Sequence, residues 1–266
     1  MLDTLLKDWG SFEAVVSQLL NGFEKRRTQQ TGYVSEPLFR GQAVAAWPLR
    51  TSLERFSQKT WSVREYFSVV RAVAPEIRSR TSKPWPLPDE DEIDEGNVGP
   101  PPGYELMIYL RHHDFPSPLL DWSRSPYVAA FFAFQSRPPD GCEAVALYSF
   151  VEYAGHAKIW DSDKARIIGT GPYVETHERH YAQQCEYTVC KMPDGDRVIY
   201  ASHDEALQKR TNVQDLLTKY VIPTSQRRYF LRKLESMNVH AYSLFRDETA
   251  LMHTLAYREI EMRDGV

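Results

Sequence analysis

Arg40 is the first residue whose type and neighbours suggest ligand binding. It follows Phe39 and precedes Gly41 and Gln42. A glycine lets a backbone or a ligand approach closely, and an arginine at a strand end presents a planar fork that matches phosphate or carboxylate oxygens. The motif therefore predicts either an anion-binding arginine or an arginine held in a structural ion pair.

The segment from His112 to Pro126 sets polar side chains between apolar ones. Asp121 stands between two large apolar residues, so we expect a partly buried carboxylate that needs donors or a cationic partner. Arg40 and Arg124 are the candidate partners. A hydrolase that uses His112 and Asp121 is an alternative, although the chain has no GxSxG nucleophile turn.

Two serines stand where the next helix should begin. Ser125 followed by Pro126 is a typical helix opening, because serine caps the free N–H groups and proline fits the first helical position. Free N–H groups at a helix start also favour anions. Ser123 and Ser125 are therefore candidate ligand contacts as well as capping residues.

A third candidate segment runs from Arg179 to Val189 and leads into a predicted strand. Gln184 and Glu186 are two positions apart and would share one strand face, whereas Gln183 would take the other. A polar, exposed strand edge is the alternative interpretation.

Periodic apolar residues predict the elements that must hold these side chains. A helix is expected over 9–23, with Asp3 or Thr4 near its start, and Ser52 should cap a helix that continues to Val73. Further helices are expected at 104–112, 125–134, 225–237 and 247–255, and strands at 38–41, 144–151, 186–192, 197–201 and 218–222. This mixture, without regular strand–helix alternation, predicts an α+β fold.

Composition narrows the class of protein. The 266 residues carry a formal net charge of −4, which argues against a dedicated nucleic-acid binder. The 3 cysteines form no disulfide framework, and with no apolar run of membrane length and no secretory signal we expect a cytoplasmic protein without a membrane partner. Adjacent side chains such as those of 112–114 seldom aim at one ion, so we expect no metal.

The three segments, in this order, resemble the FRG domain family. The motifs that carry the resemblance are Phe39-Arg40-Gly41, the block from His112 to Trp122, and the set Arg179, Gln183 and Tyr187-Thr188. The resemblance covers most of the chain after the first helix. It implies a single FRG domain over 1–266, with an N-terminal helix within 1–30 and an exposed proline-rich, acidic loop at 83–103.

The FRG pattern is itself similar to that of ADP-ribosyltransferases, which implies a core of short strands in a split β-sheet with flanking helices. It also implies NAD as substrate. By position, Arg40 would hold a phosphate of NAD, Ser123 would support the nicotinamide side, and Glu186 would stabilise the positive charge that develops on the ribose. The family-level match near Glu186 is the uncharged Gln183. The remaining residues expected at the nucleotide are Gly41, Gln42, His112, Asp121, Ser125 and Tyr187.

The resemblance thus implies an enzyme that cleaves NAD and transfers ADP-ribose to a macromolecular acceptor, either protein or nucleic acid. A toxin or an anti-phage defence effector is the expected role, with an antitoxin or regulatory protein as a further partner. If Gln183 occupies the position of the catalytic carboxylate, the alternative is a non-catalytic module that binds a nucleotide or a partner.

Overall fold

One mixed sheet forms the centre of the fold. The computed structural model describes residues 3–158, 164–208 and 214–263. The sheet has eight strands in the order β1 (Thr4–Leu5), β8 (Gln214–Pro223), β4 (Ala144–Tyr153), β2 (Leu38–Gln42), β3 (Leu119–Ser123), β6 (Cys185–Asp194) and β5 (Arg166–Gly169), with β7 (Arg197–Tyr200) paired to β6. Only β1 and β8 pair in parallel; the other pairs between these strands are antiparallel.

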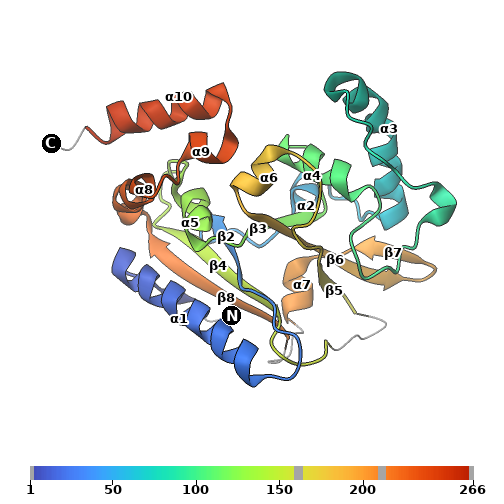
Figure 1. The fold of residues 1–266 in the computed structure, drawn as a ribbon, viewed down its shortest axis with the longest axis horizontal. Coiled ribbons are helices and arrows are strands. Elements are labelled where there is room, and N and C mark those ends of the chain that lie inside the picture. The colour runs from blue at the N-terminus through green and yellow to red at the C-terminus, as the bar shows by residue number, and fades with distance from the viewer. Residues whose placement is uncertain (1–2, 159–163, 209–213, 264–266) are drawn as a thin grey trace.

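Helices surround this sheet and confirm the α+β class. They are α1 (Trp9–Gln29), α2 (Ser52–Phe56), α3 (Val63–Thr81), α4 (Tyr104–His112), α5 (Pro126–Phe134), α6 (Glu178–Ala182), α7 (His203–Gln208), α8 (Arg227–Ser236), α9 (Ala241–Phe245) and α10 (Glu248–Ala256), with short turns at Glu90–Glu92, Thr224–Gln226 and Tyr257–Glu261. In Figure 1, α8, α9 and α10 gather at one end of the molecule and α3 lies at the other. None of the helices within the described ranges is long and apolar enough to cross a membrane.

Two apolar clusters lie on opposite halves of the sheet, and a third, which contains Leu38, Trp122 and Phe150, spans β2, β3 and β4. Phe12, Phe131 and Phe230 pack α1, α5 and α8 together over the half that contains β4 and β8. Tyr66 and Met107 pack α3 and α4 against the half that contains β3 and β6. A polar site can lie between the first two clusters, while the third cluster holds the halves of the sheet together.

The two halves meet through a very short strand pairing. We expected short strands in a split sheet, and all strands belong to one connected sheet, but β2 and β3 are joined at a single residue pair, Phe39 with Ser123. In contrast, β2 pairs with β4 over five residues, Leu38 to Gln42. Main-chain pairing between β2 and β3 is therefore limited to this one residue pair.

Several element boundaries differ from the sequence prediction. The first helix is capped by Asp8, whose side chain accepts from the Ser11 N–H, because Thr4 is taken into strand β1. The helix expected from Ser52 is two helices, capped by Thr51 and Ser62. The strand that carries Asp121, β3, was not predicted, because leucine, aspartate and tryptophan there do not alternate in polarity.

The acidic loop at 83–103 is exposed over much of its length but is anchored to α3. The Trp85 side chain is buried, and the main-chain carbonyl of Trp85 accepts a hydrogen bond from Arg78 Nη2 at 2.7 Å. Glu95 pairs with Arg64 at 3.0 Å and Glu90 with Arg71 at 2.9 Å. Part of the negative charge in this loop is thus used within the molecule.

Candidate ligand pocket between β2 and β3

Arg40 connects the two strands where their regular pairing ends. Its Nη1 donates to the main-chain carbonyl of Asp121 at 2.7 Å, so the guanidinium of a β2 residue reaches β3. The same nitrogen lies 3.9 Å from Asp121 Oδ2. The predicted partnership of Arg40 and Asp121 is therefore present, whereas Arg124, the other candidate partner, lies near Glu186 instead.

A second arginine, Arg111 at the end of α4, holds the same carboxylate. Its Nη2 donates to Asp121 Oδ2. Two guanidinium groups therefore share one carboxylate, which leaves an excess of positive charge at the site. Both arginines are largely shielded, with 15% and 18% of the side chain exposed, so this excess is poorly screened by water.

Three atoms of this cluster lack a hydrogen-bond partner among the described residues. They are Nε of Arg40, Nε of Arg111 and Oδ1 of Asp121, and all three are buried. Buried polar atoms are nearly always paired in folded proteins, so an unpaired set of two donors and one acceptor marks a place where a ligand can supply the partners. Burial lowers the pKa of Arg40 to about 10, which leaves it charged at neutral pH.

A cavity of about 330 Å³ opens onto these groups. Aromatic and polar side chains from both halves of the molecule line it. They are Phe39, Arg40, Gly41, Arg111, His112, Asp114, Asp121, Trp122, Ser123, Ala129, Phe132, Gln135, Gln183, Cys185 and Phe245. The cavity can thus receive an anionic group at the arginines and an apolar or aromatic group at the phenylalanines.

Gly41 lets helix α5 approach strand β2. A Cβ atom at this position would collide with the carbonyl oxygen of Ala129 and with the main-chain nitrogen of Ala133. The glycine of the motif therefore has a packing role, since it brings α5 against the strand that carries Arg40.

Ser123 and Gln183 line the cavity, and their hydrogen bonds connect β3, α9 and the turn before β6. Ser123 Oγ donates to the Gln183 carbonyl at 2.7 Å and accepts from the Ser125 N–H at 3.0 Å. Gln183 Nε2 donates to the Leu244 carbonyl at 3.1 Å. Ser125 accepts from the Val128 N–H and caps α5, as predicted.

Gln42 and Tyr187 lie outside the wall of this cavity. Gln42 Nε2 donates to the Trp47 carbonyl at 2.7 Å and holds the loop after β2, next to a neighbouring cavity that also touches Arg40. The Tyr187 ring is fully buried behind His112, and its Oη lies 2.8 Å from His112 Nε2. Burial lowers the pKa of His112 to about 3, so this imidazole is neutral.

Glu186 faces a different cavity from the one that contains Arg40. Strand β6 begins at Cys185, and Gln184 adopts a positive φ of 50°, so the predicted shared face of Gln184 and Glu186 does not exist. The Cys185 side chain instead lines the cavity that contains Arg40 and Arg111. Glu186 lines a second cavity of about 360 Å³ together with Arg124, whose Nε is 3.8 Å away. Burial raises the pKa of Glu186 to about 7.

Arg111, Phe132, Gln135 and Phe245 are pocket residues that sequence reasoning missed. Arg111 was detectable in principle, because it is a charged residue directly before His112 on a helix that is otherwise mostly apolar. Phe245 comes from a distant part of the chain. Arg179 fixes that part, since its guanidinium donates to the carbonyls of His112 and Phe245.

The fold and this cavity define an α+β protein with an arginine-lined polar pocket in the middle of its sheet. Residues 35–141 match the family model of the FRG domain, which confirms the resemblance that the Phe-Arg-Gly motif indicated. The matched stretch contains Arg40, Arg111, Asp121 and Ser123. No curated protein and no solved structure is significantly similar to the chain.

Proposed function

We propose that this pocket binds the phosphate groups of a nucleotide of the NAD class, and that the protein acts first of all as a nucleotide-binding FRG module. One observation carries the proposal: two buried arginines that line the cavity share a single carboxylate, and their Nε atoms lack a hydrogen-bond partner among the described residues. Phosphate oxygens are the acceptors that match such guanidinium forks.

The rest of the cavity suits the remainder of a nucleotide. Phe132 and Phe245 offer ring faces or edges to a base, and the free Oδ1 of Asp121 can accept from a ribose hydroxyl. A volume of about 330 Å³ is at the small end for ligand sites, so it would hold one nucleotide half of a dinucleotide rather than the whole molecule.

Titration calorimetry with NAD, ADP-ribose, AMP and adenosine tests this proposal. We expect the phosphorylated ligands to bind and adenosine to bind much more weakly. Arg111→Lys keeps the charge but removes the fork, so it should weaken binding by about tenfold or more. The matched control is Arg71→Lys on the exposed face of α3, which should leave the affinity for each ligand unchanged. Equal affinity for AMP and adenosine would refute a phosphate site.

NAD cleavage with transfer of ADP-ribose is the second candidate function. It is supported by the strand register: Ser123 pairs with Cys185, and Glu186 is the next residue along β6. A carboxylate there could stabilise the positive charge that forms as the nicotinamide–ribose bond breaks. Because Glu186 lines a separate cavity, a dinucleotide would have to extend beyond the arginine pocket to reach it.

Nicotinamide release, with and without cell lysate as a source of acceptor, separates the two functions. Transfer predicts release that Glu186→Gln abolishes while NAD affinity is retained. Binding without release under both conditions would reject transfer and leave the binding proposal standing. A macromolecular acceptor, a toxin or anti-phage role, and an antitoxin partner follow only if release is observed. The hydrolase alternative has less support, because His112 contacts Tyr187 whereas Asp121 contacts arginines.

A further inference from the structure

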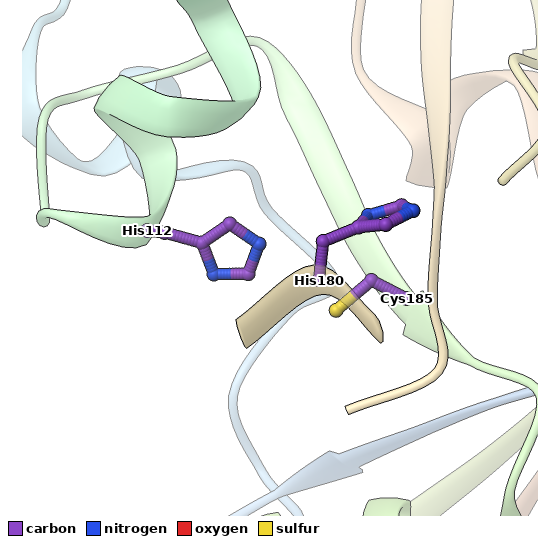
Figure 2. A group of neighbouring side chains, drawn as sticks. All are labelled: His112, His180 and Cys185. Carbon is purple, nitrogen blue, oxygen red and sulfur yellow. The ribbon is translucent and has the colours of Figure 1, made fainter. Parts of the chain in front are cut away.

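Three potential metal ligands lie close together, and two of them, His112 and Cys185, line the arginine pocket. His112 at the end of α4, His180 on α6 and Cys185 at the start of β6 each bring one ligand atom within 4.8 Å of the other two. Figure 2 shows the three neighbouring side chains, each of which comes from a separate element. His180 and Cys185 are buried and His112 is partly buried.

The orientation of His180 leaves one ring nitrogen available to the cluster. Its Nε2 lies 2.8 Å from the carbonyl oxygen of Pro172, and a carbonyl can only accept, so Nε2 carries the proton. In the neutral ring Nδ1 then carries a lone pair, which lies 3.2 Å from the Tyr187 hydroxyl. A histidine that donates its other N–H to a main-chain carbonyl is the usual arrangement around protein-bound metals, because it fixes both the ring and its tautomer.

The other two ligands are also held by rigid parts of the fold. Cys185 pairs with Ser123 in the β3–β6 ladder. The main chain at His112 is fixed by Arg179, whose Nη1 donates to its carbonyl at 2.8 Å. Little main-chain movement is therefore needed for the three side chains to act together.

We propose that His112, His180 and Cys185 form a binding site for a borderline-soft divalent transition-metal ion, with Zn²⁺ as the preferred ion. Two imidazole nitrogens and one thiolate are typical Zn²⁺ ligands, and three protein ligands leave one coordination position open. Binding forms the metal–sulfur bond and releases the thiol proton to solvent. Because His112 and Cys185 also line the arginine pocket, a ligand in that pocket would lie beside the ion.

To bind the ion, the three ligand atoms must move closer together and the Tyr187 hydroxyl must change its hydrogen bonds. Ligand atoms around Zn²⁺ are about 3.5 Å apart, so the side chains must move inward by roughly 1 Å. The Tyr187 hydroxyl lies 2.8 Å from His112 Nε2 and 3.2 Å from His180 Nδ1. At least one of these hydrogen bonds must be given up when the ion enters. The competing explanation is that the cluster is only a hydrogen-bond network centred on Tyr187.

Titration of the metal-free protein with Co²⁺ separates these explanations. We expect saturation at about one ion per chain, with a thiolate-to-cobalt charge-transfer band in the near ultraviolet and visible bands typical of four-coordination. Zn²⁺ should then displace Co²⁺ and remove both sets of bands. A hydrogen-bond network alone predicts no thiolate band at any cobalt concentration, and that result would overturn the proposal.

Two variants show which residues bind the ion. Cys185→Ser should abolish the charge-transfer band, and His112→Ala should weaken Co²⁺ and Zn²⁺ binding by about tenfold or more. The matched controls are Cys142→Ser and His253→Ala, which change a cysteine and a histidine away from the site and should leave the titration unaltered. Circular dichroism of each metal-free variant verifies the fold. A folded Cys185→Ser variant with an unchanged band would also overturn the assignment.

Discussion

Arg40 Nη1 donates to the main-chain carbonyl of Asp121 at 2.7 Å, and this contact spans the place where β2 and β3 part. The two strands are paired only at Phe39 and Ser123, so an arginine side chain joins the halves of the sheet where main-chain hydrogen bonds do not. The residue proposed to bind phosphate is therefore also a structural link, and substitutions there must be separated into effects on folding and on binding.

Asp121→Asn should destabilise the protein and make its stability more dependent on anions. The substitution leaves Arg40 and Arg111 without a carboxylate, which should lower the free energy of unfolding by about 2 kcal/mol. Phosphate added to the buffer should restore more stability to the variant than to the wild type, because the uncompensated positive charge would be larger. Urea denaturation with and without phosphate measures both effects. Asp91→Asn, in the exposed acidic loop, should show neither.

Gly41→Ala should be strongly destabilising although it adds only one methyl group. The new Cβ would collide with the main chain of α5 at Ala129 and Ala133, which cannot move aside as a side chain can. We expect a loss of about 2–3 kcal/mol in urea denaturation. Gly22→Ala in α1 is the matched control, since a Cβ there meets nothing within 4 Å, and it should stabilise the protein by about 0.5–1 kcal/mol.

Glu186 should make the protein less stable as the pH rises from about 4.5 to about 7. Its pKa is raised from 4.5 to about 7 by burial, only partly offset by Arg124, with Glu36 and Glu152 also raising it. Between these values the native state keeps a proton that the unfolded state has lost, so stability is complete below pH 4.5 and falls through this window.

Glu186→Gln removes this titration. The variant should therefore exceed the wild type in stability at pH 8 by on the order of 1–2 kcal/mol, and the difference should shrink toward pH 4.5. Thermal and urea denaturation across this pH range provide the measurement. Glu175→Gln, at an exposed position in the loop between β5 and α6, should give a curve parallel to that of the wild type. A pH-independent difference for Glu186→Gln would contradict the prediction.

Lys158→Met should reveal a buried ion cluster beside β4, β5 and β8. Lys158 Nζ lies 2.8 Å from Glu152 and 2.9 Å from Asp215, and only 2% of the lysine side chain is exposed. Removing the cation leaves two carboxylates facing each other, which should cost about 3–5 kcal/mol of unfolding free energy. The double variant that also changes Glu152 to Gln should recover part of this loss, and additive effects of the two changes would argue against the cluster.

Local signals in the sequence determined much of the framework. Ser125 with Pro126 predicted the start of α5, and the strand that contains Arg40 and Gly41 was predicted from its residues alone, because capping and backbone preferences act over a few neighbours. Asp121 was also predicted to be a partly buried carboxylate that needs a cation, with Arg40 as one of two candidate partners.

Tertiary structure alone decided which side chains share the pocket. Strand residues alternate between faces, so the position at which β6 begins determines whether Cys185 or Glu186 turns toward Arg40. The turn at Gln184, with its positive φ, fixes the residue at which β6 begins. No local sequence pattern predicted this turn. The pairing of Arg111 with Asp121 and the meeting of His112, His180 and Cys185 likewise depend on strand register and helix packing, which join residues far apart in the chain.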